Sequence, residues 1–326
     1  MTPLNRRSFL TIAGASIGAG ALFRVRPLSA EDGAGRDVAR LLKDGNGEAP
    51  APFSFVQISD THVGFEGPPN PLGTKAFERA VEVVNALSPA PDLVLFTGDL
   101  THDSEKPGEP AARMKRFKEI AAGLTVKNVK CVPGEHDAGL DGGVLFRNVF
   151  GDSHYAFDHK GVHFVALDNV SQGKPVVGAE QVGWLKRDLA RFPKTAPIVV
   201  FTHRPLFDLA PDWEWFTGDG DEVMNLLAPF ENVTVLYGHI HRRDERVLGR
   251  ARHHAARSLV FGFPDPAVTG EKKPLSFDAA RPFANLGISE ARAGAKGALA
   301  LTDTELTIRE YAGTAGITQM KKGGLL

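Results

Sequence analysis

The sequence predicts an α/β fold in which two β-sheets form a sandwich core flanked by helices. Two observations lead to this expectation. Up to about residue 245, short apolar runs rich in β-branched residues alternate with stretches of helical periodicity, a pattern typical of buried strands joined by helices. Beyond residue 245 the helical pattern stops, and short runs typical of antiparallel strands follow.

Each element follows from its own pattern. A strand over 53–58 precedes a helix over 74–87, whose apolar residues fall on one face. The same alternation then gives strand 93–97, helix 109–124, strand 127–132, helix 178–192, strand 197–201, helix 219–229 and strand 233–237. Two alternating runs, at 155–157 and 162–167, flank a turn and predict a hairpin. The last part predicts strands 259–261, 298–301 and 305–309, with a proline-rich excursion over 262–286.

Five short clusters of acidic residues and histidines follow predicted strands. They are Asp60-Thr61-His62, Gly98-Asp99, Gly134-Glu135-His136-Asp137, Thr202-His203-Arg204 and Gly238-His239-Ile240-His241. Open α/β folds place their ligands at the carboxyl ends of strands, so we expect the five clusters to converge on one rim. Carboxylates and imidazoles without cysteine suit divalent metals such as Mn, Fe or Zn.

The clusters contain more candidate ligands than one tetrahedral ion can use. These are Asp60, His62, Asp99, Glu135, His203, His239 and His241. Two divalent ions about 3.5–4 Å apart that share one carboxylate would use such a set. Sites of this kind serve in-line displacement at phosphorus, because the metals generate a nucleophile from water and neutralise charge on the phosphoryl oxygens.

The order D-x-H, G-D, G-N-H-D, H, G-H-x-H resembles that of the calcineurin-like metallophosphoesterase family, apart from Glu135, and the resemblance covers about residues 53–245. It implies a four-layer α/β/β/α fold and the hydrolysis of phosphoesters. It also implies a first metal site formed by Asp60, His62, Asp99 and His241, and a second formed by Glu135, His203 and His239, with Asp99 as the bridge. His136 would assist the leaving oxygen, and Asp137 would orient or charge-stabilise that imidazole.

Glu135 departs from the family, which usually has Asn at this position. In one hypothesis, the Glu135 carboxylate binds the second metal more tightly but leaves it a weaker Lewis acid. In the alternative, Glu135 binds no metal and points at a neighbouring basic group. The substrate class also stays open at this point. A site without extra cationic groups slightly favours a phosphodiesterase over a periplasmic phosphomonoesterase, and a non-catalytic metal-binding or interaction module on the same fold is a third interpretation.

Other polar residues near the clusters have two interpretations each. Arg204 could bind a phosphate oxygen of the substrate, or pair with a surface carboxylate. His102 and Asp103 could fix the orientation of Asp99, or lie in an exposed loop. Trp213 and Trp215 lie between two of the clusters, where they could overhang the site or simply pack.

Three further positions have a structural expectation. His163 alternates within an apolar run, which predicts a core histidine. His253-His254 is expected as a surface pair at the entry to a strand. Cys131 is the single cysteine, which excludes an internal disulfide and predicts a small buried side chain rather than a nucleophile.

The N-terminal residues Asn5-Arg6-Arg7-Ser8-Phe9-Leu10 form a twin-arginine pattern, followed by an apolar run too short and weak to span a bilayer. We therefore expect a signal peptide over 1–30, a loose arm over 31–52 and a metallophosphoesterase domain over 53–318. The twin-arginine machinery would export the folded protein to the periplasm or the exterior of a bacterium. No stable membrane insertion is expected after processing.

Composition restricts the partners. A formal net charge of −1 with 24% charged residues gives no basic field, so a nucleic-acid partner is not expected. The expected substrate is a small-molecule or lipid head-group phosphoester, and the expected cofactor is a pair of divalent ions (Mn, Fe or Zn).

Overall fold

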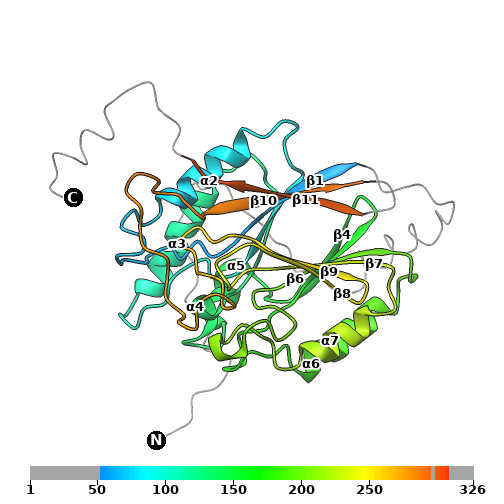
Figure 1. Ribbon diagram of the computed structural model, residues 1–326. Helices are drawn as coiled ribbons and strands as arrows, with labels where there is room; N and C mark the ends of the chain where they lie inside the picture. Colours follow the sequence, from blue (N-terminus) through cyan, green and yellow to red (C-terminus); the bar gives the residue numbers. More distant parts are fainter. Residues whose placement is uncertain (1–51, 295–297, 308–326) are drawn as a thin grey trace, which may run out of the picture.

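A computed structural model describes residues 52–294 and 298–307 (Figure 1). The expected signal peptide and all but the last residue of the expected arm lie outside these residues, as does the part of the expected domain beyond residue 307. Within the described residues, no helix combines the length and apolar character that crossing a bilayer requires.

The first sheet has five strands in the order β11-β10-β1-β2-β3. Its strands are β1 (Phe53–Ile58), β2 (Leu93–Thr97), β3 (Val129–Val132), β10 (Gly287–Ala293) and β11 (Leu299–Glu305). The first three are parallel neighbours, whereas β10 pairs antiparallel with both β1 and β11. The carboxyl ends of β1, β2 and β3 therefore meet at one edge of this sheet.

The second sheet has six strands in the order β4-β5-β6-β7-β9-β8. Its strands are β4 (Tyr155–His159), β5 (Val162–Ala166), β6 (Pro197–Phe201), β7 (Asn232–Tyr237), β8 (Asp244–Leu248) and β9 (Ala251–Ala255). The strands β5, β6, β7 and β9 run parallel, and the antiparallel strands β4 and β8 close the two edges.

Apolar side chains join these sheets into the expected four layers. Phe55, Leu95, Phe164 and Phe201 belong to the buried cluster between the two sheets. On the outer face of the first sheet, β1 and β2 pack against α2 (Lys75–Asn85), α3 (Glu109–Ala121) and α5 (Val144–Phe150). On the outer face of the second sheet lie α6 (Ala179–Leu189) and α7 (Gly220–Leu227) (Figure 1). The fold class predicted from the sequence is confirmed.

The C-terminal part differs from the expectation. Residues 259–261 form no strand. Leu259 is apolar because it is buried in the helix-side core, and its amide donates to the Asp60 carbonyl instead of joining a ladder. Most of the expected strand 298–301 and the first residue of the expected strand 305–309 belong to one strand, β11 (Leu299–Glu305), and residues 308 and 309 lie outside the described residues. Strands β8, β9 and β10 were not predicted, because their charged residues conceal the alternating pattern.

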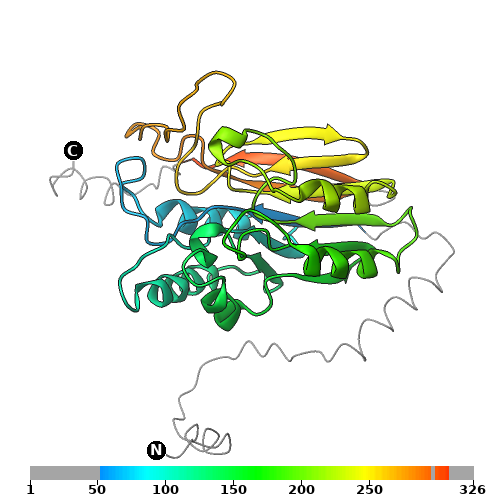
Figure 2. The ribbon, with the colours of Figure 1, turned by 90° about the horizontal axis from the view of Figure 1, so that it is seen from below.

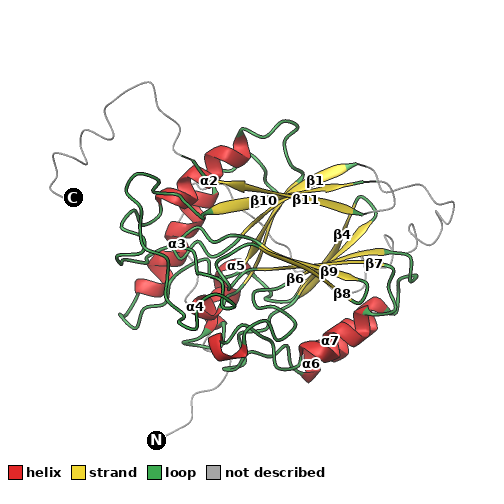
Figure 3. Ribbon diagram, in the orientation of Figure 1, coloured by secondary structure: helices red, strands yellow, loops and turns green. Residues whose placement is uncertain are grey.

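Loops gather at one end of the strands. Figure 3 shows this loop-rich end beside the helices α4 (Glu135–Ala138) and α5, away from the ends at which β1 and β7 begin. In Figure 2 the orange segment that precedes β10 projects at the same end as the blue and cyan loops that follow β1 and β2. The loop-rich end is therefore where segments distant in the sequence come together.

Candidate metal centre

All seven candidate ligands lie together at the loop-rich end. They follow β1, β2, β3, β6 and β7, as the sequence pattern predicts. Their ligand atoms form two groups, within each of which all atoms lie within 4.8 Å of one another. We call Asp60, His62, Asp99 and His241 the first group, and Glu135, His203 and His239 the second group.

The first group is compact and buried. The Nε2 atom of His62 lies 3.3 Å from Asp99 Oδ2 and 3.2 Å from His241 Nε2. The same His241 nitrogen lies 3.3 Å from Asp60 Oδ1. Imidazole nitrogens and carboxylate oxygens thus face a common point away from water, a donor set that suits a divalent cation.

The second group adjoins the first through Asp99. His203 Nε2 lies 3.4 Å from Asp99 Oδ2 and 2.8 Å from Glu135 Oε2. His239 Nδ1 lies 2.7 Å from the other Glu135 oxygen. His203 Nε2 and Glu135 Oε2 are buried and form no hydrogen bond despite their proximity. Such a pair of unpartnered donor atoms fits a cation bound between them.

Hydrogen bonds to backbone carbonyls fix which histidine nitrogen faces each group. The Nδ1 atoms of His203 and His241 lie 2.7 Å from the Thr97 carbonyl oxygen and 3.0 Å from the Phe261 carbonyl oxygen. A carbonyl oxygen only accepts, so Nδ1 donates and Nε2 is the nitrogen that faces the cluster. In His239 the roles reverse, because Nε2 donates to the Glu214 carbonyl at 3.2 Å. This is the arrangement found around metal-binding histidines.

The backbone at the site is strained. Five of the seven candidate ligands have positive φ angles: Asp60 at 54°, His62 at 41°, Asp99 at 47°, His239 at 64° and His241 at 52°. Non-glycine residues in this region are uncommon and cluster at functional sites. The fold therefore holds these side chains in place against a local conformational cost.

Two glycines permit the close approach of the loops. A Cβ atom on Gly134 would lie 2.1 Å from Asp99 Oδ1, and one on Gly238 would lie 1.9 Å from Ser59 Oγ and 2.6 Å from Asp60 Oδ2. Each glycine immediately precedes a candidate ligand and packs against the loop that carries another. These two glycines are therefore required by the close contact of the loops.

Glu135 lies within the second group and also faces a neighbouring basic group. It contacts His203 and His239 in the second group, and its Oε1 atom also lies 3.3 Å from Arg204 Nη2. Burial alone would raise the pKa of the Glu135 carboxyl, but the facing histidines outweigh it and hold the pKa well below its usual range. Glu135 is thus an anion within the cluster that also pairs with a neighbouring cation.

Arg204 is buried, which neither of its two expected roles foresaw. Its Nη1 atom donates to the Glu214 carbonyl at 2.6 Å, while Nη2 faces Glu135. The carboxylate that pairs with Arg204 is therefore inside the site rather than on the surface. Arg204 holds Glu135 and the Glu214 turn together at the edge of the second group.

The His136 imidazole lies beside the first group. Its ring centroid is 4.8 Å from that of His62, and 30% of its side chain is exposed. Its Nδ1 atom donates to Asp103 Oδ1 at 2.6 Å. Burial lowers the pKa of His136, but Asp99, Glu135 and the bond to Asp103 outweigh it and raise the pKa above the usual value. The imidazole therefore favours its protonated form.

The structure gives Asp137 a different role from the expected one. Its two oxygens accept hydrogen bonds from the backbone amides of Leu100, Thr101 and Gly134 and from the Thr101 hydroxyl. Burial and the nearby Asp99 raise the pKa of the Asp137 carboxyl to about 6. Asp137 ties the loop after β2 to the loop after β3, whereas Asp103 orients the His136 ring.

The remaining expectations have mixed outcomes. His102 contacts the site, with Nδ1 at 3.2 Å from His62 Nδ1 and its ring stacked on that of His136. Trp213 and Trp215 are buried in a core cluster, so packing is their role. The sequence does not predict Lys272 at the site, because the excursion over 262–286 has no periodic pattern to place it. Its ammonium donates to the Trp213 carbonyl at 2.7 Å.

The structure also places three histidines outside the site. His163 is a core histidine, as expected, bonded to Asp158 and Asp188 at 2.7 Å each. The expectation of a surface pair at His253 and His254 is wrong. Both are fully buried in β9, because His254 faces Ser289 of the first sheet and His253 packs against the Phe207 ring.

Cys131 is partly buried against the helix-side core. Burial raises the pKa of its thiol to about 12, so the side chain stays protonated and is not a nucleophile. The expectation from the sequence is confirmed.

A sequence profile described as "Calcineurin-like phosphoesterase" matches residues 53–243, more than half of the 326 residues. The chain belongs to this family. As a calcineurin-like phosphoesterase it is a phosphoric ester hydrolase, and membership implies divalent metals. The seven clustered donors and their oriented imidazoles fit such ions.

Relatives of this calcineurin-like phosphoesterase carry related names. It is 29% identical over 201 residues to "Probable glycerophosphodiester phosphodiesterase GpdQ" of Arcobacter nitrofigilis, with 57% of this chain and 71% of that protein covered. It is 27% identical to serine/threonine-protein phosphatase CPPED1 of Danio rerio, with 64% and 76% covered. It is 26% identical to 3′,5′-cyclic adenosine monophosphate phosphodiesterase CpdA of Pseudomonas aeruginosa, with 64% and 77% covered.

Among solved structures, the chain is similar to GAP50, the anchor in the inner membrane complex of Plasmodium. The TM-score is 0.52 at 14% sequence identity, with 83% of this chain and 94% of that chain covered. At this identity the likeness concerns the fold alone, and it agrees with the two packed sheets described above.

Proposed function

We propose that the protein hydrolyses small phosphodiesters at a centre of two divalent ions. The observation that carries this proposal is the position of Asp99, whose Oδ2 atom lies 3.3 Å from His62 and 3.4 Å from His203. Asp99 therefore joins the first and second groups in the way that a bridging carboxylate requires. Two ions bound there would supply an activated water and neutralise charge on the phosphoryl oxygens.

The chain's own residues have distinct tasks in this reaction. Water adds its oxygen to phosphorus, the ester P–O bond breaks, and the leaving oxygen needs a proton. His136 is placed to provide it, because Asp103 holds Nδ1 and leaves Nε2 to carry the transferred proton. Asp137 and the motif glycines keep the loops in register while this occurs.

A diester fits the charges of the site better than a monoester. Arg204, the cation that could have received a second phosphate charge, already binds Glu135 and the Glu214 carbonyl. A diester carries one negative charge, whereas a monoester carries nearly two at neutral pH. Two of the relatives named above are phosphodiesterases, which supports the same choice.

The test is hydrolysis of a chromogenic phosphodiester and its monoester analogue, with the protein loaded in turn with Mn, Zn or Fe. We expect metal-dependent turnover with a preference for the diester, and a rate about 10²–10⁴-fold lower in His136→Ala with metal content unchanged. Preference for the monoester would overturn the substrate class. Near-full activity of the variant would overturn the role of His136.

Membership of a family of phosphoric ester hydrolases argues against the third interpretation, a non-catalytic module. Binding of two metals without turnover of either ester would contradict the proposed function.

We also propose export by the twin-arginine route to a bacterial periplasm or exterior, from residues 5–10. Cell fractionation of an Arg6→Lys, Arg7→Lys double variant tests this. We expect the protein to be retained in the cytoplasm, and unchanged export would contradict the route.

A further inference from the structure

Phe65 and Phe261 are phenylalanines beside the metal centre that belong to none of the four core clusters of the described residues. Both are partly exposed. The Phe65 ring lies 5.1 Å from that of His102 and 5.2 Å from that of Phe261. The Phe261 ring lies 4.8 Å from that of His241 and 6.3 Å from that of His62. Their ring neighbours are thus one another, histidines of the centre and, for Phe261, the Phe263 ring at 5.5 Å.

These rings are not needed to hold the histidines. His241 is fixed by the Phe261 backbone carbonyl, which any side chain at this position would provide. His62 is fixed by the contacts of its two nitrogens with Asp99, His241 and His102. Apolar rings exposed at the mouth of a polar site are typical of ligand-binding surfaces.

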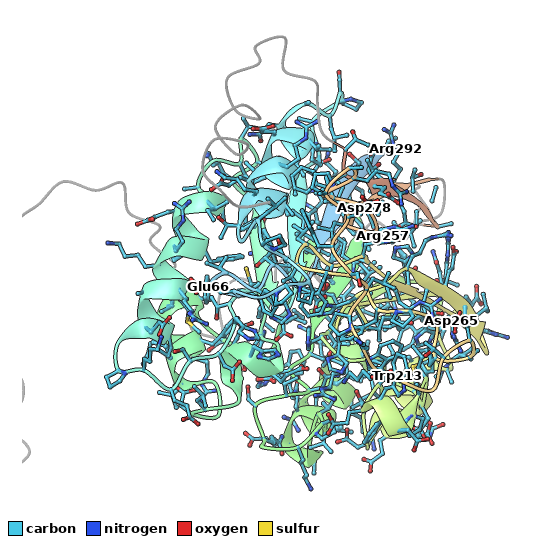
Figure 4. The ribbon with its side chains drawn as sticks, turned by 60° about the vertical axis from the view of Figure 1, so that its left-hand side comes forward. Glu66, Trp213, Arg257, Asp265, Asp278 and Arg292 are labelled. Carbon is cyan, nitrogen blue, oxygen red and sulfur yellow. The ribbon has the colours of Figure 1, made fainter. Side chains whose placement is uncertain are left out.

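The centre therefore has two unlike sides. Beside the first group lie Phe65 and Phe261, and His136 stands on the same side, its ring 4.5 Å from that of His102. Beside the second group lie Arg204 and the Glu214 carbonyl. In Figure 4, Glu66 lies on the left of the molecule and Trp213 lies on the lower right.

We propose that Phe65 and Phe261 bind the base of a nucleoside phosphodiester whose phosphate lies at the metal centre. This inference rests on the proposed phosphodiesterase function and names its substrate class. The two rings meet at 62°, so a base can stack on the face of one and contact the edge of the other. Base–aromatic stacking tolerates different bases, because every base has a π-face.

Other head groups fit these rings less well. Glycerol and ethanolamine have no planar face. A choline head group can bind aromatic rings through its cation, but here it would lie next to a centre built to hold divalent cations. The Phe65 and Phe261 rings therefore favour a neutral planar group over a cationic one.

The test compares two esters that differ only in the base. One is adenosine 3′,5′-cyclic phosphate, and the other is 1-O-methylribose 3′,5′-cyclic phosphate, so the reacting phosphate is the same. We expect a kcat/KM about 10-fold higher for the ester with the base, the range of one stacking interaction. In Phe65→Leu and Phe261→Leu we expect this ratio to fall toward one. The matched control is Phe283→Leu, since Phe283 is partly buried against a core cluster, and it should keep the ratio.

A binding measurement separates failure of this inference from failure of the proposed function. Calorimetry gives the Kd of adenosine 5′-monophosphate and of ribose 5-phosphate for the same proteins. If the chromogenic diester is not hydrolysed either, the proposed diesterase function fails, and the Kd ratio still decides the inference. Equal Kd values, a ratio unchanged in both variants, or a preference for glycerophosphocholine over both cyclic esters would overturn it.

Discussion

Replacing His253 with leucine is expected to make the protein less sensitive to acid. His253 is fully buried in β9, 5.0 Å from the Phe207 ring, and neither of its ring nitrogens has a hydrogen-bond partner among the described residues. Burial, assisted by the positive charge of Arg246 and only partly opposed by Asp244, lowers its pKa from 6.5 to about 4. The folded protein therefore holds His253 neutral.

The sign and size of the effect follow from proton linkage. Above pH 6.5 the ring is neutral in both states and stability does not depend on it. Between pH 6.5 and 4 the unfolded chain takes up a proton that the folded protein refuses, so stability falls as the pH falls. The full shift corresponds to about 3 kcal/mol at about 1.4 kcal/mol per pH unit, and the part between pH 7 and pH 5 to about 2 kcal/mol.

Urea unfolding of the wild type and His253→Leu at pH 7 and pH 5, at one fixed metal concentration, measures this. Groups that titrate alike in both proteins cancel in the comparison. We expect the wild type to lose about 2 kcal/mol more than the variant between the two pH values. An equal loss in both proteins would refute the reasoning, because it would mean that His253 is protonated within the fold.

Three further changes test other parts of the structure. Asp103→Asn removes the carboxylate that accepts from His136 Nδ1 and raises the His136 pKa. We therefore expect kcat to fall less than in His136→Ala and the pH–kcat profile to move toward lower pH. An unmoved profile would contradict this role. Glu135→Asn removes a carboxylate from the second group, so titration with metal should show weaker binding of one ion and turnover should change; unchanged stoichiometry and rate would dismiss any metal role for Glu135. Gly134→Ala places a methyl group against Asp99, and we expect metal affinity about 10–100-fold lower in a chelator competition, whereas wild-type affinity would show that the loops can separate freely.

His163 provides a pH prediction of opposite sign. Burial lowers its pKa, but the bonds to Asp158 and Asp188 outweigh burial and raise it above 6.5. A raised pKa in the folded state adds stability that is fully present below pH 6.5 and is lost as the pH rises through the folded value. The destabilisation caused by His163→Gln, measured by urea unfolding, should therefore be larger at pH 6 than at pH 9. An equal cost at both values would contradict the charged state assigned to His163.

The sequence predicts the parts of this molecule that depend on local pattern. The parallel strands ending at Ile58, Thr97 and Phe201 are buried runs without charge, so both their existence and their bounds follow from composition. The site follows as well, because polar residues directly after such strands must meet at one edge. Strand β9 does not follow, because Arg252, His253 and His254 are adjacent there, and contacts with distant segments bury the two histidines.

Contacts across the chain could not be predicted in the same way. Asp103 and Asp137 are both acidic neighbours of candidate site residues, and no periodic pattern distinguishes the one that reaches His136 from the one that ties the backbone. Phe261 belongs to an apolar run that suggests a strand, whereas the fold places its ring beside His241. These roles depend on distances between segments far apart in the sequence.

The metal centre draws its ligands from both layers of the sandwich. Asp60, Asp99 and Glu135 follow strands of the first sheet, whereas His203 and His239 follow strands of the second. Ions bound between them would link the two sheets at one end of an interface that is otherwise held by apolar side chains. Any movement of one sheet relative to the other would change the distances between the candidate ligands. A substitution between the sheets, far from any reacting atom, would therefore alter catalysis by changing the spacing of these ligands.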